Sequence, residues 1–304
     1  MRKDFVNLAD FDGGQLEALL RRAIEDKKLF KGGRLQPTLV NKTLAMIFQK
    51  ASLRTRVSFE TAMTHLGGHA IYLSREDIGL GKREPIKDIA RVLGRMCDGI
   101  MARTFSHEHV EQLAEFADVP VVNALSDYSH PCQAMADLMT VMERRGSVGG
   151  LRLAFIGDGN NVARSLAVAC SRLGMSFTLA CPEGYDLDFA TLDISYRDCD
   201  IVRDAASAAA AADVVYTDTW VSMGQEEQRE ERLRDFAGFQ VNVELLASAR
   251  DDVIVLHCLP AYRGREITDE AFEAHASSIL DQSENRLHFQ RSLLNVLMAE
   301  GGVR

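Results

Sequence analysis

Short apolar runs that favour β-strands alternate with amphipathic helical stretches along nearly the whole chain of 304 residues. This alternation is typical of parallel sheets, in which a crossover helix follows each strand. Strands are predicted at 43–49, 69–73, 98–102, 120–124, 151–157, 176–181, 213–217 and 253–257. The pattern therefore predicts an α/β fold with parallel sheets.

Two domains are expected, because 304 residues exceed what one hydrophobic core usually serves. A helical pattern at 131–145 ends in the turn-forming sequence RRGSVGG, after which a new strand begins at Leu151. This helix is predicted to connect the two domains. Other helices are predicted at 57–66, 86–96, 205–213, 236–246 and 284–300.

The charge and the cysteine pattern narrow the class of protein. A formal net charge of −9 and a pI near 5.4 argue against a nucleic-acid or anionic-membrane surface, which needs a broad excess of Lys and Arg. No apolar run has the length of a signal peptide or a membrane span, so we expect a cytoplasmic protein. The six cysteines fall singly, without the spacing of a zinc site or a disulfide framework.

Polar side chains follow six of the eight predicted strands. They occur at 52–56, 103–104, 129–133, 157–161, 218–224 and 257–260. Ligands of open parallel sheets bind beyond the carboxyl ends of the strands. These residues therefore predict a ligand site.

The stretch KASLRTRVSFE, residues 50–60, concentrates positive charge in an acidic chain. Ser52 stands at an N-cap position, and the free N–H groups of a first helical turn attract anions such as phosphate. Arg54 adds a fork of donors and Thr55 adds a hydroxyl. The alternative is a capped surface helix whose arginines pair with carboxylates, and Arg56 is expected to be structural.

His130 and Gln133 lie one helical turn apart, with Pro131 between them at a favourable first helical position. An imidazole can donate to a carbonyl oxygen, and the Gln side-chain carbonyl can accept from an NH₂ group. The pair therefore suits a ligand with a polarised carbonyl and an amide. A lone histidine is more often structural, but the presence of Arg54 and Arg103 at the same predicted site favours a ligand-binding role for His130.

The sequence GDGNN at 157–161 follows a strand and opens a helix, but it lacks the third glycine of a dinucleotide fingerprint. Two asparagines at a helix start suit the carboxylate or amine of a zwitterion. Asp218 can hold an ammonium group at the end of another strand, with Ser222 and the backbone of Met223 orienting an α-amino acid. The alternative is a turn with an Asx cap.

Cys258 lies at the end of a predicted buried strand, in the sequence HCLP. Its thiol could be a nucleophile, a hydrogen-bond partner for an amine, or a packing group. His257 is adjacent in sequence and is expected on the opposite side of the strand, so no Cys-His catalytic pair is predicted.

Seven motifs, in this order, resemble those of the aspartate/ornithine carbamoyltransferase family and span nearly the whole chain. They are S-x-R-T-R at 52–56, M-A-R at 101–103, H-P-x-Q at 130–133, D-G-N-N at 158–161, D-x-x-x-S-M-G at 218–224, H-C-L-P-A-x-R-G at 257–264 and E-N-R-L-H-x-Q at 284–290. Any one of them could arise by accident, whereas seven in the right order hardly can. The resemblance is strongest to the members that use ornithine.

The resemblance implies two domains, each a parallel β-sheet flanked by helices, with the active site in the cleft between them. Residues 1–135, joined by a C-terminal helix at about 286–304, would bind carbamoyl phosphate. Residues 136–285 would bind ornithine. The resemblance also implies a cis peptide bond before Pro260 that aims the carbonyl of Leu259.

The resemblance assigns site residues position by position. The residues implied to bind carbamoyl phosphate are Ser52, Leu53 through its backbone, Arg54, Thr55, Gly79, Arg103, His130, Gln133, Cys258, Leu259 and Arg286. The residues implied to bind ornithine are Asn161, Asp218, Ser222 and Met223. Arg54, Arg103, His130 and Cys258 would be catalytic.

Two positions depart from the family pattern. Leu53 replaces the commoner threonine, which matters little if only the backbone makes the contact. Gly79 stands where the family often has a glutamine that reaches a neighbouring subunit's site. Either that contact is lost, or Lys82 or Arg83 in the same loop supplies it.

The implied activity is transfer of the carbamoyl group from carbamoyl phosphate to L-ornithine, giving L-citrulline and phosphate, in arginine metabolism. No cofactor and no metal would be required, and a homotrimer or a multiple of it is expected. Both the biosynthetic and the catabolic direction are compatible with the motifs. The alternatives are a carbamoyltransferase for another amine, such as putrescine or an N-acylated ornithine, or a non-catalytic relative on the same scaffold.

Overall fold

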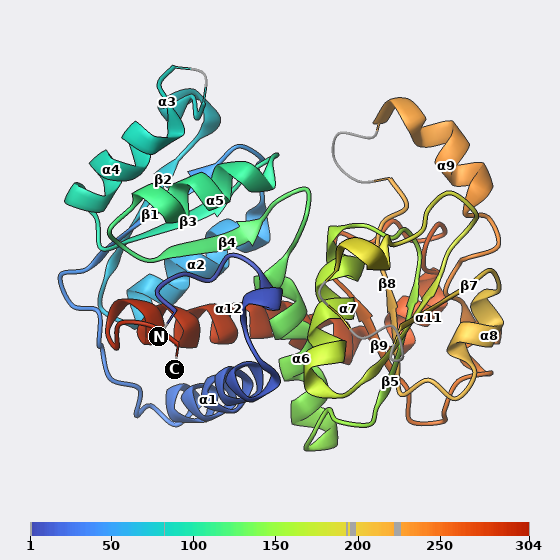
Figure 1. The fold of residues 1–304 in the computed structure, drawn as a ribbon. Coiled ribbons are helices and arrows are strands. Elements are labelled where there is room, and N and C mark those ends of the chain that lie inside the picture. Colours follow the sequence, from blue (N-terminus) through green and yellow to red (C-terminus); the bar gives the residue numbers. More distant parts are fainter. Residues whose placement is uncertain (1, 82, 193, 195–198, 222–225, 304) are drawn as a thin grey trace. The chain divides into compact units, whose positions relative to one another are not determined.

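A computed structural model describes residues 2–81, 83–192, 194, 199–221 and 226–303 (Figure 1). The chain divides into two compact units, which we call unit 1 and unit 2. Unit 1 comprises Met1–Met139 and Asn285–Arg304, and unit 2 comprises Thr140–Glu284. Two helices, α6 (Pro131–Arg145) and α12 (Ala276–Met298), begin in one unit and end in the other.

Unit 1 is built on a parallel sheet of four strands in the order β2-β1-β3-β4. The strands are β1 (Thr43–Phe48), β2 (His69–Leu73), β3 (Gly99–Arg103) and β4 (Val121–Leu125). The helices are α1 (Gly13–Lys31), α2 (Leu53–His65), α3 (Arg75–Ile78), α4 (Ile86–Met96) and α5 (His107–Phe116), and a short 3₁₀ helix covers Leu8–Asp10. The four strands predicted for this part of the chain are confirmed.

Helices α4 and α5 cover one face of the unit 1 sheet (Figure 1). Ile86, Ile89 and Ala90 recur at helical spacing on α4 and are buried. They pack in one cluster with alternate residues of the strands, such as Ala45 and Ile47. Because the strands run parallel, the carboxyl ends of β1, β3 and β4 lie at one edge of the sheet.

Unit 2 contains a parallel sheet of five strands in the order β7-β6-β5-β8-β9. The strands are β5 (Arg152–Ile156), β6 (Ser176–Ala180), β7 (Cys199–Val202), β8 (Val214–Thr217) and β9 (Ile254–His257). The helices are α7 (Asn161–Leu173), α8 (Ala205–Ala209), α9 (Arg229–Asp235), α10 (Val243–Leu246) and α11 (Asp269–Ala274), with 3₁₀ turns at Phe189–Thr191 and Glu226–Gln228. The expectation of two parallel sheets flanked by helices is confirmed.

In unit 2 one strand was not predicted, and one predicted helix is wrong. Strand β7 was not predicted, because its four residues CDIV sit at the sheet edge and form too short an apolar run. The helix predicted at 236–246 does not form: α9 ends before Phe236, and α10 begins only at Val243. Phe239 and Val241 are buried in the unit 2 core, so their apolar spacing reflects packing of a loop and not a helix.

The alanine-rich tract at 205–213 forms a shorter helix than predicted. Helix α8 ends at Ala209, and Ala211 has a φ of 58°, in the left-handed region.

None of the helices in the described part of the chain is both long and apolar enough to cross a membrane.

Candidate active site

The start of α2 in unit 1 gathers hydrogen-bond donors. Ser52 is the N-cap residue, and its Oγ accepts from the backbone N–H of Thr55 at 3.3 Å. The hydroxyl oxygen of Thr55 lies 3.1 Å from Ser52 Oγ and accepts from Arg286 Nη2 at 2.7 Å. Thr55 and Arg286 are both buried. A helix N-terminus with a guanidinium held beside it offers the N–H donors and the positive charge that suit a multiply charged anion.

Leu53 and Arg56, which also lie at the start of α2, do not direct their side chains to this donor cluster. The side chain of Leu53 is 76% exposed, so this residue adds only its backbone N–H to the donors of the first turn. Arg56 is exposed, pairs with Glu60 at 2.9 Å and stacks 4.1 Å from the centroid of the Tyr72 ring. The expectation that Arg56 is structural is therefore confirmed.

Arg103 ends β3, which pairs with β1, and His130 lies in the segment that follows β4, the strand beyond β3. Phe48 of β1 pairs in register with Arg103 of β3, which in turn pairs with Leu125 of β4. Arg103 is buried, and the chain after β4 leads to His130 at the start of α6. Parallel pairing thus carries these side chains to the same sheet edge as α2.

His130 is buried, and its pKa lies well below the usual value of 6.5. Burial is the main cause, and the positive charges of Arg286, Arg103 and Arg54 add to it. The imidazole is therefore neutral at physiological pH. It can donate one hydrogen bond to a carbonyl oxygen, but it does not add a fourth positive charge to the site.

Gln133 is buried one turn into α6, and its Nε2 donates to Asp137 Oδ1 at 2.7 Å. Its Oε1 is also buried and makes no hydrogen bond within the described residues. The amide therefore has one occupied end and one acceptor that a ligand can use.

Lys50 is a further cation close to Arg103, and no role was predicted for it. Its Nζ lies 4.6 Å from the centroid of the Phe105 ring. Burial lowers the pKa of Lys50, and the positive charge of Arg103 lowers it further. Its position in the cationic stretch 50–60 was the only signal in the sequence.

Gly79 ends helix α3 and has a φ of 52°, in the left-handed region that glycine adopts easily. A Cβ at this position would lie 3.1 Å from Arg83 Cβ. The residue therefore terminates a helix, and it has no side chain to offer a ligand. Arg83 is exposed, whereas Lys82 lies outside the described residues.

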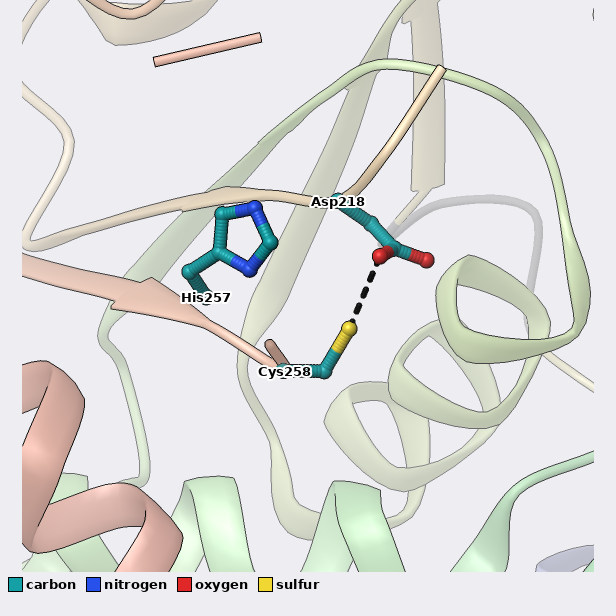
Figure 2. A group of neighbouring side chains, drawn as sticks. All are labelled: Asp218, His257 and Cys258. Atoms are coloured by element: carbon teal, nitrogen blue, oxygen red, sulfur yellow. Dashed lines mark hydrogen bonds between the residues drawn. The ribbon is translucent and has the colours of Figure 1, made fainter. Parts of the chain in front are cut away.

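In unit 2, Asp218 follows β8 and is buried. Its Oδ2 accepts from Asn160 Nδ2 at 2.9 Å. Its Oδ1 accepts from the backbone N–H of Thr219 at 2.7 Å and from Cys258 Sγ at 2.8 Å, the bond drawn in Figure 2. The carboxylate is thus held by groups from three separate segments of the chain.

Of the two asparagines predicted to meet a ligand, Asn160 is the one whose side chain holds Asp218. Asn160 is the N-cap of α7: its Oδ1 accepts from the N–H groups of Val162 and Ala163 at 2.9 and 3.1 Å. Asn161 is the first residue of that helix. The N-cap pattern of GDGNN was the signal that could have identified Asn160.

The HCLP segment turns sharply after β9. His257 is the last residue of β9, Leu259 has a φ of 58°, and the Leu259–Pro260 peptide bond is cis, as expected. His257 Nδ1 accepts from the N–H of Leu259 at 2.9 Å, and its Nε2 lies 3.2 Å from Glu266 Oε1. The buried His257–Glu266 pair therefore supports the backbone of the turn.

The prediction that His257 points away from Cys258 is wrong. One ligand atom each from Asp218, His257 and Cys258 lie within 4.8 Å of one another (Figure 2). Strand alternation does not extend to Cys258, because β9 ends at His257 and the chain then turns.

These three side chains are a possible set of metal ligands, since carboxylate, imidazole and thiolate all bind zinc. The hydrogen bonds of His257 weigh against that use, because both ring nitrogens already have partners. Ligation through Nδ1 would break the bond that holds Leu259. The geometry fits an amine-binding group better, with Asp218 and Cys258 offering a carboxylate and a thiol.

The loops around Asp218 are tied together by a buried arginine. Arg232 on α9 forms an ion pair with Asp158, and its Nε donates to the carbonyl of Trp220 at 2.6 Å. The loop after β5 is thereby joined to the loop after β8. Ser222 and Met223, predicted to bind an α-amino acid, lie outside the described residues.

Two parallel-sheet units, one with a donor cluster suited to an anion and the other with a hydrogen-bonded carboxylate at a strand end, place the chain among the α/β proteins that bind ligands beyond the carboxyl ends of their strands. Comparison with family models gives two matches. The aspartate/ornithine carbamoyltransferase carbamoyl-P binding domain matches residues 3–143, and the Asp/Orn binding domain of the same family matches residues 149–297. The chain belongs to the aspartate/ornithine carbamoyltransferase family.

Relatives of this chain within the family are named for ornithine. An ornithine carbamoyltransferase of Methanosarcina mazei is 48% identical, covering 98% of this chain and 100% of the relative. An anabolic ornithine carbamoyltransferase of Pyrococcus furiosus is 46% identical, covering 99% of this chain and 98% of the relative. The solved structure of ornithine carbamoyltransferase from Pyrococcus furiosus covers 99% of this chain and 98% of its own, with a TM-score of 0.93. The structure of the anabolic enzyme from Campylobacter jejuni is 39% identical over 97% of this chain and 99% of its own, with a TM-score of 0.92.

Proposed function

We propose that this chain is an ornithine carbamoyltransferase, which converts carbamoyl phosphate and L-ornithine to L-citrulline and phosphate in arginine metabolism. The observation that carries the proposal is the donor cluster at the start of α2. There the helix N-terminus, the Thr55 hydroxyl and the Arg286 guanidinium converge. Such a cluster suits the dianionic phosphate of the carbamoyl donor.

The two substrates are assigned to different parts of the chain. Residues 1–135 and about 286–304 would bind carbamoyl phosphate, and 136–285 would bind ornithine. The division of the chain at Met139 and Asn285 supports this assignment. The two family models, which match residues 3–143 and 149–297, support it as well.

The phosphate would be held by the start of α2 and the surrounding guanidiniums. These groups are Ser52, the backbone of Leu53, Arg54, Thr55, Arg103 and Arg286. The backbone of Gly79 would add a contact from a neighbouring subunit, with Lys82 or Arg83 supplying the side-chain contact that a glycine lacks.

His130 and Gln133 would bind the carbamoyl group. Neutral His130 would donate to the carbonyl oxygen, and Gln133 Oε1 would accept from the NH₂ group. Their supporting observations are the lowered pKa of His130 and the buried, unoccupied acceptor of Gln133.

Ornithine would be held by Asp218 and Asn161, together with Ser222 and Met223. Cys258 and the carbonyl of Leu259 would orient the δ-amine and complete the carbamoyl pocket. The hydrogen bond from Cys258 to Asp218 supports a shared role for these two side chains.

The reaction forms one bond and breaks another. The lone pair of the δ-amine attacks the carbonyl carbon, the bond from that carbon to the phosphate oxygen breaks, and the electron pair leaves with phosphate. The nitrogen, positively charged after the attack, gives up one proton to the departing phosphate, which leaves neutral citrulline. Arg54, Thr55, Arg103 and His130 would stabilise the developing negative charge. Carbamoyl phosphate is already activated, so positioning and charge stabilisation suffice.

The attacking amine must first lose a proton. An alkyl ammonium has a pKa of about 10.4, so roughly one molecule in a thousand is neutral at pH 7.5. Asp218 alone would favour the charged form. Cys258 and the Leu259 carbonyl would orient an amine that loses its proton on or before binding.

A cytoplasmic homotrimer is part of the proposal. Leu53 and Val57 on α2 and Ile71 on the edge strand β2 are apolar and exposed, which suits contact with another copy of the chain. The six cysteines, all within the described residues, form no disulfide bonds there, which suits a reducing compartment. Light scattering coupled to gel filtration tests the assembly, and a monomeric mass would contradict it.

Phosphate release, with identification of the carbamoylated product, tests the proposed activity; that product is citrulline when ornithine is the acceptor. Purified protein is given carbamoyl phosphate with L-ornithine and, in parallel, with putrescine, N-acetylornithine or aspartate. The highest rate is expected with L-ornithine. A higher rate with another amine would move the protein to a sister activity. No turnover, together with thermal stabilisation by NAD and not by carbamoyl phosphate, would indicate a binding module instead.

A further inference from the structure

Gln133 and Asp137 form a buried pair on one face of α6. They lie one helical turn apart, their exposed fractions are 1% and 0%, and Gln133 Nε2 donates to Asp137 Oδ1 at 2.7 Å. Both residues belong to unit 1. No motif in the sequence analysis included Asp137.

The chemistry of the pair determines which way the Gln133 amide faces. An amide has a donating NH₂ end and an accepting carbonyl end, and the 2.7 Å bond from Gln133 Nε2 to Asp137 Oδ1 uses the donating end. The NH₂ end must therefore face Asp137, and Oε1 must face away. That oxygen is buried and makes no hydrogen bond within the described residues, a state that is costly unless a ligand donates to it.

We propose that Asp137 is a positioning residue that locks Gln133 as a hydrogen-bond acceptor and thereby makes the site specific for the carbamoyl NH₂ group. The proposal rests on the proposed function, since it concerns the donor substrate of that reaction. Acetyl phosphate carries a methyl group where carbamoyl phosphate carries NH₂, and it cannot donate to Gln133. A site built to hydrogen-bond an N–H rejects analogues that lack it.

The test exchanges the two polar groups between the two positions. Asp137→Asn offers Gln133 both a donor and an acceptor, so both orientations of its amide become possible. Gln133→Glu sets two carboxylates against each other. In the double variant Q133E/D137N, the Asn NH₂ again donates within the pair, and a Glu oxygen remains as acceptor. The double variant also keeps the net charge of the native pair.

The measured quantities are the dissociation constants of carbamoyl phosphate and acetyl phosphate, obtained by calorimetry at pH 8 with the intact protein. We expect each single variant to bind carbamoyl phosphate about tenfold or more weakly while acetyl phosphate binding changes less than threefold. We expect the double variant to recover to within about fivefold of the native protein. Asp118→Asn, an exposed carboxylate of the same unit, is the matched control and should change neither constant.

Two outcomes would overturn the proposal. One is an equal loss of affinity for both acyl phosphates, which a general structural defect would cause. The other is a double variant no more selective than the single ones. If a single variant is too unstable to measure, the selectivity of the double variant decides. Because ligand binding is measured apart from citrulline formation, failure of the proposed activity remains distinguishable from failure of this inference.

Discussion

Asn160 Nδ2 donates a 2.9 Å hydrogen bond to Asp218 Oδ2, while Oδ1 of the same amide caps helix α7. The cap fixes the orientation of the amide, because only its oxygen can accept from the N–H groups of the first turn. The NH₂ group must then face Asp218. One side chain therefore couples the start of a helix to the carboxylate proposed to bind ornithine.

Replacement of Asn160 by alanine should affect stability and ornithine binding together. Loss of the cap should lower the free energy of unfolding by about 1 kcal/mol. Loss of the bond to Asp218 should raise the KM for ornithine by roughly tenfold, since one lost hydrogen bond to a charged group is worth about 1.5 kcal/mol. Urea unfolding and steady-state kinetics measure the two effects.

Asn242→Ala is the matched control for that variant. Asn242 caps α10, with its Oδ1 accepting from the N–H of Leu245 at 2.8 Å. It should lower stability without changing the KM for ornithine. If both variants changed the KM equally, the specific link between Asn160 and Asp218 would be refuted.

Arg54→Gln should reduce kcat/KM for carbamoyl phosphate by about 100-fold or more, because it removes a donor to the developing negative charge. Arg56→Gln on the same helix should leave it within about twofold, since Arg56 forms only an exposed ion pair with Glu60 and a stacking contact with Tyr72. Near-native turnover of the Arg54 variant would show that the phosphate binds elsewhere.

The rate should rise with pH if the neutral amine is the nucleophile. At saturating carbamoyl phosphate, kcat/KM for ornithine should increase by about tenfold per pH unit between pH 7 and 8.5, because the fraction of neutral amine grows by that factor below a pKa of about 10.4. A flat profile, both in kcat/KM and at saturating ornithine, would contradict this mechanism.

The lowered pKa of His130 predicts a loss of stability in acid. Below about pH 6.5 the unfolded chain binds a proton at this histidine, whereas the folded protein binds it only at much lower pH. The contribution is therefore fully present above pH 6.5 and falls by up to about 1.4 kcal/mol per pH unit below it. His65 and His275, whose pKa values are also lowered by burial, act in the same direction.

Urea unfolding of the ligand-free protein at pH 7 and pH 5.5 tests this prediction. His130→Gln should lose less stability between the two pH values than the native protein. His69→Gln, which removes an exposed histidine, should retain the native difference. An unchanged difference in the His130 variant would mean that its imidazole is protonated equally in both states.

Local chemistry explains why much of the fold and site could be predicted. Strands such as β1 and β5 can be predicted from their apolar runs. The start of α2 can be predicted from Ser52, a preferred N-cap residue that directly precedes the helix. The failures lie where packing overrides local pattern. Phe239 mimics a helical spacing because it fills the unit 2 core from a loop.

The sequence by itself determined the alternation of strands and helices and the kinds of side chain that follow the strands, since these depend on residues close together in the chain. Only the tertiary structure decided how those side chains are used. Arg286 reaches Thr55 across 231 residues, and Asn160 reaches Asp218 across 58. The orientation of a hydrogen bond and the charge state of a buried imidazole depend on such distant partners, and no local pattern specifies them.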